Sequence, residues 1–470
     1  MKIASLAILA LSATLAGANT PLQARTQLQV AIADGRIQGV ETDGVVAFKG
    51  IPFAAPPVGD LRWRAPQPVR PWAELKQATD YGADCMQVLG APMPATAKVS
   101  EDCLFANVWR AADATGKTPI LLWIFGGGFV VGGSSPTIYT GDAMARQGVM
   151  FISFNYRVGR FGTFGHPQLT AANADKGLEV NYGLMDILAM LRWVKRNAAA
   201  FGGDPDNVTI VGESAGASAV HMLLGSPMAK GLFKRAIIQS SGIGMPAWST
   251  DGATIARAEA AGVNFAKAKG IAENDPQALA KLRALPATEV VDGLSMTSSA
   301  AAQAEPRTYT LPIVDGIINV DAPVRYRAGT WNKVPVMVGA TSNDMGGPDG
   351  YMIHGARAMA DLFSSQGVPT YYYRFSYVAD SQRKPDTVGA IHGSDIAFFF
   401  DTVDNRYAPA TTAKDRGVGR IMSRYMANFV KTGNPNGPGL GDWEPHIPSA
   451  PVMINFTAEG GAQLQRNPTP

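Results

Sequence analysis

Short runs of β-branched and aromatic residues alternate with amphipathic segments along most of this chain. The runs span residues 120–125, 149–155, 208–211, 236–239, 334–338 and 371–377. Turn residues bound each of them, which is typical of β-strands. Between two of them, residues 184–196 place leucine and isoleucine at helical spacing, which indicates a helix with one buried face. The alternation predicts an α/β fold with a mostly parallel central sheet flanked by helices.

Residues 249–306 break this pattern, because they are rich in alanine and contain no strand-like run. Residues 294–304, rich in serine and alanine, predict a mobile loop. Before them, three leucines share one face of a helix that a proline ends: Leu279, Leu282, Leu285 and Pro286. We expect a helical insertion over about 249–306 within a single domain of residues 19–470.

The first residues have the pattern of an export signal. Lys2 precedes an apolar run over residues 3–15, and Ala16-Gly17-Ala18 is a small-residue cleavage site. A membrane anchor is the alternative, but the run is short for a span, and no later stretch is long and apolar enough. We expect cleavage after Ala18 and an exported protein, periplasmic or secreted.

Two cysteines, Cys85 and Cys103, lie 18 positions apart beyond that segment. In an exported protein such a pair is most simply a disulfide, which would stabilise the fold by about 3 kcal/mol. Two free buried thiols are the alternative.

Charge gives little sign of a macromolecular partner. The 470 residues carry 41 Lys and Arg against 38 Asp and Glu, a net charge of +3. No cluster of basic residues stands out, which argues against nucleic-acid binding. The sequence indicates no particular oligomeric state.

The clearest chemical motif is Gly-Glu-Ser-Ala-Gly at residues 212–216. A strand-like run precedes it and a helix-permissive run follows, the context of a nucleophile elbow. Such a turn lifts the Ser214 hydroxyl clear of the sheet. Ala215 then opens the helix, so its N–H can point at a developing oxyanion.

A serine nucleophile needs a base and an acid. Among five histidines, His392 lies in a late loop beyond the last predicted strand and is followed by glycine. Asp344 follows the strand at 334–338, where a parallel sheet binds ligands. The order Ser, Asp, His fits an α/β-hydrolase. Asp349 is a nearby rival, and Asp315 is interpreted as a turn residue.

Three glycines, residues 126–128, follow the strand at 120–125. Such a loop brings backbone N–H groups close to a substrate, as the second half of an oxyanion hole does. A phosphate cradle is not supported, because neither Gly-Lys-Ser/Thr nor G-x-G-x-x-G can be drawn here. No histidine pair has metal-ligand spacing, so we expect no cofactor and no metal.

With these motifs in place, the chain resembles the type-B carboxylesterases of the α/β-hydrolase fold, which include cholinesterases and bacterial para-nitrobenzyl esterases. The resemblance covers most of residues 19–470 and is carried by these blocks: Gly50 to Ala54, Glu101-Asp102-Cys103-Leu104, Trp123 to Phe129, Asn155-Tyr156-Arg157, Asn181 to Asp186, Phe201 to Pro205, the elbow, His392-Gly393-Ser394-Asp395, and Asn428 to Pro435. It implies Ser214 as nucleophile, His392 as base and Asp344 as acid. It also implies a Cys85–Cys103 disulfide and an oxyanion hole of three backbone N–H groups, from Gly127, Gly128 and Ala215.

The chain departs from that family at two points. The family acid is usually Glu followed by Gly, whereas here Asp344 precedes Met345. The segment between the cysteines contains no Trp, Tyr or Phe. Cholinesterases hold a quaternary ammonium there by cation–π attraction, so its absence argues against choline esters.

These features predict a serine esterase that hydrolyses a small-molecule carboxylic ester through an acyl-enzyme. An amidase, a carbamate hydrolase or a lactonase with the same triad is the alternative, because the discriminating contacts lie in distant loops. A non-catalytic adhesion-type module on this fold is least expected. Such relatives lose the nucleophile or base, and this chain keeps both.

Overall fold

The computed structural model describes residues 28–90, 93–242 and 254–466. The expected signal segment, residues 1–18, lies outside those ranges. Within them, no helix combines the length and the apolar character needed to cross a membrane.

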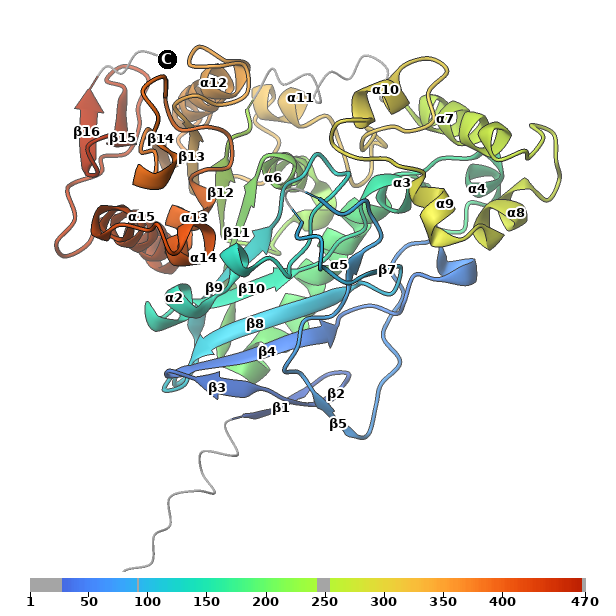
Figure 1. Cartoon of the computed structure of the whole chain (residues 1–470), viewed down its shortest axis with the longest axis horizontal. Coiled ribbons are helices and arrows are strands. Elements are labelled where there is room, and N and C mark those ends of the chain that lie inside the picture. Colours follow the sequence, from blue (N-terminus) through green and yellow to red (C-terminus); the bar gives the residue numbers. More distant parts are fainter. Residues whose placement is uncertain (1–27, 91–92, 243–253, 467–470) are drawn as a thin grey trace, which may run out of the picture.

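An eleven-stranded sheet forms the centre of the molecule (Figure 1). Its strands, in spatial order, are β16 (Ala462–Arg466), β15 (Val452–Phe456), β14 (Thr370–Phe375), β13 (Val336–Thr341), β12 (Arg235–Gln239), β11 (Gly203–Glu213), β9 (Thr118–Ile124), β10 (Met150–Phe154), β8 (Phe105–Ala111), β4 (Val45–Pro52) and β3 (Val40–Thr42). The strands from β10 across to β15 pair in parallel, and the strands at both ends pair antiparallel. The expected α/β fold with a mostly parallel sheet is confirmed.

Helices flank the sheet, and their bounds are α2 (Asp142–Arg146), α3 (Gly159–Gly162), α4 (Pro167–Ala172), α5 (Tyr182–Asn197), α6 (Ala215–Gly225), α7 (Ile255–Ala268), α8 (Ala278–Ala284), α9 (Ala287–Val291), α10 (Ser299–Gln303), α11 (Ala322–Arg327), α12 (Tyr351–Ser365), α13 (Ile396–Phe399), α14 (Val403–Tyr407) and α15 (Ala413–Thr432). Every residue of β10, β12, β13 and β14 is buried. This follows from helices covering both faces, which is why these strands are mostly apolar in sequence and do not alternate with polar residues. The helix predicted at 184–196 is α5.

Helices α7 to α10 occupy the region where the sequence predicts an insertion, and Figure 1 shows them on the opposite side of the molecule from α13 to α15. The predicted leucine helix is α8. The loop predicted at 294–304 is partly helical, since α10 spans Ser299–Gln303. Just before it, Ser295 N donates to Ser298 Oγ (2.8 Å). Such local serine bonds, followed by alanines of high helix propensity, favour a helical turn.

Cys85 and Cys103 form a disulfide with Cα atoms 4.9 Å apart, which confirms the predicted pairing. Cys85 ends the short strand β6 (Asp84–Cys85), which pairs with β7 (Val99–Ser100). The remaining small sheet contains β1 (Gln29–Ile32), β2 (Gly35–Gln38) and β5 (Leu75–Gln77). Beside the disulfide, Gln87 accepts from Gly132 N and donates to Gly132 O, both at 2.7 Å. The disulfide loop therefore braces the segment that follows the glycine loop.

Candidate active site

Ser214 stands at the turn between β11 and α6. Its backbone has φ 55° and ψ −122°, a region that non-glycine residues rarely adopt and that costs of order 1–3 kcal/mol. The turn is held on both sides. Ser214 N donates to Gln239 O (3.0 Å), and Ser218 N donates to Ser214 O (2.9 Å). The strained serine is thus fixed directly after the carboxyl end of β11.

Two glycines make this turn possible. A Cβ on Gly212 would lie 2.3 Å from the backbone of Gly216, and one on Gly216 would lie 2.0 Å from Ile124 O. Both distances are far shorter than any real Cβ contact. The elbow can pack onto the end of β9 only because these positions carry no side chain.

The glycine loop at residues 126–128 packs directly against the elbow. A Cβ on Gly126 would lie 2.6 Å from Glu213 Oε2 and 3.1 Å from the Ser214 Cβ. Gly127 and Gly128 have φ +110° and +63°, conformations that glycine adopts without strain. Among the described residues, the backbone N–H groups of Gly127, Gly128 and Ala215 have no hydrogen-bond acceptor. Unpaired buried N–H groups are rare in proteins, so these three are available to an incoming oxyanion.

Asp344 lies just beyond the end of β13, with its side chain fully buried. Its Oδ2 accepts hydrogen bonds from Ser240 Oγ (2.6 Å), Thr341 Oγ1 (2.9 Å) and Thr341 N (3.1 Å). Its Oδ1 accepts from Met345 N (2.8 Å). Burial alone would raise the pKa of Asp344, but the hydrogen bond and charge of His392 hold that pKa below its usual range.

His392 meets this carboxylate from the loop after β14. Its Nδ1 lies 2.7 Å from Asp344 Oδ1. Two hydrogen bonds join the loops that carry these residues. Asn343 N donates to Ala390 O (2.8 Å), and Ala390 N donates to the side-chain oxygen of Ser342 (3.0 Å). The structure therefore brings the acid and base of the sequence analysis together.

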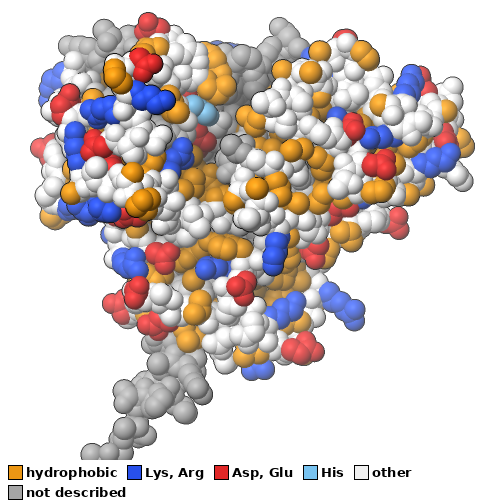
Figure 2. All heavy atoms as spheres, viewed as in Figure 1, with side chains coloured by type: hydrophobic (Ala, Val, Ile, Leu, Met, Phe, Trp, Pro, Cys, Tyr) orange, Lys and Arg blue, Asp and Glu red, His pale blue; other side chains and the backbone are white. Residues whose placement is uncertain are grey.

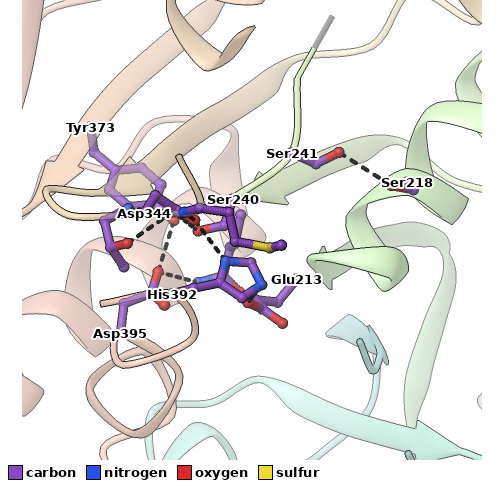
Figure 3. Close-up of polar contacts among 11 residues, drawn as sticks. Glu213, Ser218, Ser240, Ser241, Asp344, Tyr373, His392 and Asp395 are labelled. Carbon is purple, nitrogen blue, oxygen red and sulfur yellow. Dashed lines mark hydrogen bonds and ion pairs between the residues drawn. The ribbon is translucent and has the colours of Figure 1, made fainter. Parts of the chain in front are cut away.

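The other ring nitrogen, His392 Nε2, faces Glu213 and lies 3.2 Å from its Oε1 (Figure 3). Within the described ranges, Ser214 Oγ makes no hydrogen bond, although Ser214 and His392 line the same cavity. A small turn of the imidazole toward the serine is needed for proton transfer, and such contacts often tighten only with substrate bound.

Carboxylates surround the imidazole. Burial would lower the pKa of His392, but Glu213, Asp344 and Asp395 together raise it to about 9. Burial raises the pKa of Glu213 to about 7, against the opposing charge of His392. These charges therefore set the pH above which the imidazole is neutral and can accept a proton.

Asp395 supports the imidazole loop from below. It is fully buried, and its Oδ2 accepts from Gln239 Nε2 (3.2 Å) and the Tyr373 hydroxyl (3.3 Å) (Figure 3). Burial and the Asp344 charge raise the pKa of Asp395 to about 6. In the sequence, Asp395 and Glu213 stand out only as parts of motifs. Their contact with the base depends on folding that no local pattern encodes.

Ser214 and His392 line a cavity of about 220 Å³. Its other walls include Gly126, Gly127, Ile138, Tyr139, Met296, Ile396 and Arg406. Met296 comes from the insertion, and a Cβ on Gly128 would lie 2.8 Å from its sulfur. Figure 2 shows hydrophobic side chains gathered on this face between the two upper parts of the molecule. Larger cavities of about 400 and 490 Å³ do not include the serine.

The rival residues lie elsewhere. Asp349 is exposed, and Asp315 accepts from three backbone N–H groups of its own turn. Four histidines have other surroundings: His166 caps α4, His221 contacts Tyr326, His446 contacts Asp361, and His354 is exposed on α12. Within the described ranges, no group of three or more His, Cys, Asp or Glu is arranged to hold a metal ion.

Comparison with known proteins gives a consistent result. The sequence model of the carboxylesterase family matches residues 26–348 and 347–468. A fumonisin B1 esterase from Sphingopyxis macrogoltabida is 39% identical over 317 residues, covering 66% of this chain and 55% of that esterase. A para-nitrobenzyl esterase from Bacillus subtilis (strain 168) is 30% identical over 86% of this chain and 89% of its own. Carboxylesterase 1C from Mus musculus is 30% identical over 85% of this chain and 83% of its own.

Proposed function

Because the chain belongs to the carboxylesterase family and is thus a carboxylic ester hydrolase of the serine esterase type, we propose that Ser214, His392 and Asp344 are its catalytic triad. The substrate is a small-molecule ester. No cofactor enters the reaction, since each proton and electron pair moves between these side chains, the ester and water.

The reaction begins when His392 Nε2 takes the Ser214 proton as the hydroxyl oxygen attacks the ester carbonyl carbon. The carbonyl oxygen becomes an oxyanion, which accepts hydrogen bonds from the N–H groups of Gly127, Gly128 and Ala215. His392 then protonates the leaving alcohol, and the acyl group stays on Ser214. Water, deprotonated by His392, attacks the acyl-enzyme and releases the acid. Asp344 keeps the proton on Nδ1 throughout.

The observation that carries this proposal is the 2.7 Å contact between His392 Nδ1 and Asp344 Oδ1 at the cavity that Ser214 lines. It fixes the tautomer in which Nε2 is the basic nitrogen. The strained backbone of Ser214 supports the same assignment, since such strain gathers at functional sites.

The Ser214→Ala variant tests the nucleophile. Its hydrolysis of a short-chain nitrophenyl ester should fall by about 10⁴-fold or more while its circular dichroism spectrum stays unchanged. Ser218→Ala is the matched control, because Ser218 lies one turn further along α6, buried against Ser241 (3.4 Å). Near-wild-type turnover by Ser214→Ala would overturn the proposal.

We also propose that the chain is exported after cleavage behind Ala18. Support comes from the charged, apolar and small-residue order of residues 2–18 and from the Cys85–Cys103 disulfide, a bond typical of oxidising compartments. Intact mass and N-terminal sequencing of protein from cell fractions should find a chain that begins at Asn19 outside the cytoplasm. Full-length protein in the cytoplasm alone would contradict this.

A further inference from the structure

Arg406 brings a positive charge to the catalytic cavity. It lies at the end of the short helix α14, and its side chain lines the cavity together with Ser214 and His392. The residue is exposed, and it also lines the neighbouring cavity of about 490 Å³. It therefore stands where a ligand of the reactive serine can reach it.

This guanidinium has no counter-ion in the part of the chain that the structure describes. No carboxylate there lies within ion-pair distance of Arg406. The nearest acid in sequence is Asp404, and both of its carboxylate oxygens accept hydrogen bonds from Arg416 at 2.7 to 3.1 Å. Arg406 instead contacts its neighbour Tyr407, whose ring lies 5.7 Å from the guanidinium carbon and whose hydroxyl is a hydrogen-bond partner. Arg406 thus lines the cavity with its charge unpaired by any carboxylate of the described residues.

The remaining charges of the cavity are already engaged. Glu213 is in contact with His392 Nε2, and Asp344 is surrounded by donors. The positive charge of Arg406 opposes the effect of burial on the pKa of Glu213, so its field reaches the reacting groups. The other walls of the cavity include the apolar side chains of Ile138 and Ile396. The guanidinium of Arg406 is therefore open to an anionic group of a ligand that enters the cavity.

We propose that Arg406 binds a carboxylate of the substrate, so that the preferred esters of this site carry a free acid group close to the ester bond. The inference rests on the proposed function, because the same substrate must present its carbonyl to Ser214. A guanidinium suits this task, since its planar fork pairs with both oxygens of a carboxylate. The cavity of about 220 Å³ leaves room for only a few carbons between ester and acid. The oxyanion hole at Gly127 and Gly128 remains a separate site.

Two pairs of esters test the inference, each pair matched in shape but not in charge. Monoethyl glutarate and ethyl glutaramate differ in the acyl part, as carboxylate and carboxamide. Meta-acetoxybenzoate and meta-acetoxybenzamide differ likewise in the alcohol part. The quantity measured is the ratio of kcat/KM for the acid to kcat/KM for the amide, by pH-stat titration of the purified protein.

The wild type should favour the acid in at least one pair. In Arg406→Gln, the ratio of that pair should fall by about tenfold to a hundredfold, the effect of losing one charge-assisted hydrogen bond. Arg406→Lys should lie between them, because it keeps the charge but not the fork. The control is Lys384→Gln, which removes a positive charge from the neighbouring cavity only.

A ratio that changes by less than about threefold in Arg406→Gln, or that falls equally in Lys384→Gln, would overturn the inference, the latter by showing general attraction of anions. Failure of the proposed function would look different. In that case the wild type would hydrolyse neither member of either pair, nor a nitrophenyl ester.

Discussion

The two sides of the catalytic cavity differ in what holds their geometry. On one side, residues 126–128 and 212–216 are shaped by backbone. Gly126, Gly212 and Gly216 pack so closely against neighbouring atoms that no side chain fits, and the three N–H groups of the proposed oxyanion hole have no acceptor among the described residues. On the other side, Asp344, His392 and Asp395 are held by side-chain contacts with one another and with Gln239 and Ser240 at the end of β12. The first side depends on excluded volume, and the second depends on charge.

Substitutions on the two sides should therefore have different effects. A change on the backbone side should disturb packing first and chemistry as a result. A change on the loop side should leave the fold intact and alter the rate or its pH dependence. Three variants separate these outcomes.

Asp344→Asn should have the largest effect on rate. The amide has nearly the shape of the carboxylate, but it neither fixes the Nδ1 proton nor stabilises the imidazolium, so kcat should fall by about 10⁴-fold with a native melting temperature. Asp349→Asn, at an exposed position five residues on, is the control for nitrophenyl ester hydrolysis. A greater loss in Asp349→Asn would assign the acid to that residue.

Gly216→Ala should have the largest effect on stability. The new Cβ would lie 2.0 Å from Ile124 O and 2.6 Å from Phe125 O, both rigid backbone atoms. We expect a loss of about 3 kcal/mol in the free energy of unfolding, seen in urea denaturation, with activity lost as the elbow shifts.

The matched control is Gly417→Ala in α15. A Cβ at Gly417 meets nothing within 4 Å, so the substitution should stabilise the helix by about 0.5 to 1 kcal/mol. Equal stability of the Gly216→Ala variant and the wild type would contradict the account of the backbone side.

Glu213→Gln should have the smallest effect, a displaced pH profile. Glu213 belongs to the elbow by position, but its carboxylate faces His392 Nε2 at 3.2 Å, so its removal acts on charge as a change on the loop side does. His392 must be neutral to act as base, so kcat/KM should rise with pH as His392 loses its proton, whose pKa is raised to about 9. Removing the Glu213 charge removes one cause of that elevation. The midpoint of the rise should therefore move to lower pH, by about one unit. A midpoint that moves upward, or that moves equally in Asp349→Asn, would contradict the role given to Glu213.

The same contrast explains what the sequence could predict. The six strand runs, the α5 helix, the elbow and the glycine loop are local patterns, because apolar periodicity and glycine positions directly reflect backbone geometry. Asp344 and His392 followed from chain order and family resemblance. The structure brings them into contact.

Other features could not be read from local patterns. The surroundings of His392 include Glu213 and Asp395, whose charges act on it only after the four strands from β11 to β14 lie side by side. Arg406 reaches the cavity from α14 and Met296 from the turn before α10, two segments far apart in sequence. The helical turn at Ser299–Gln303 replaced a predicted loop because serine side chains supplied the local bonds.

The most direct test of the triad is to identify the residue that a covalent inhibitor modifies. The purified protein is incubated with a nitrophenyl phosphonate ester, digested, and analysed by tandem mass spectrometry. We expect one equivalent of nitrophenol to be released and a phosphonyl group to be found on Ser214. In Asp344→Asn, both the release and the modification should be greatly slowed. A phosphonyl group on another residue, or nitrophenol release without any adduct on Ser214, would contradict the account.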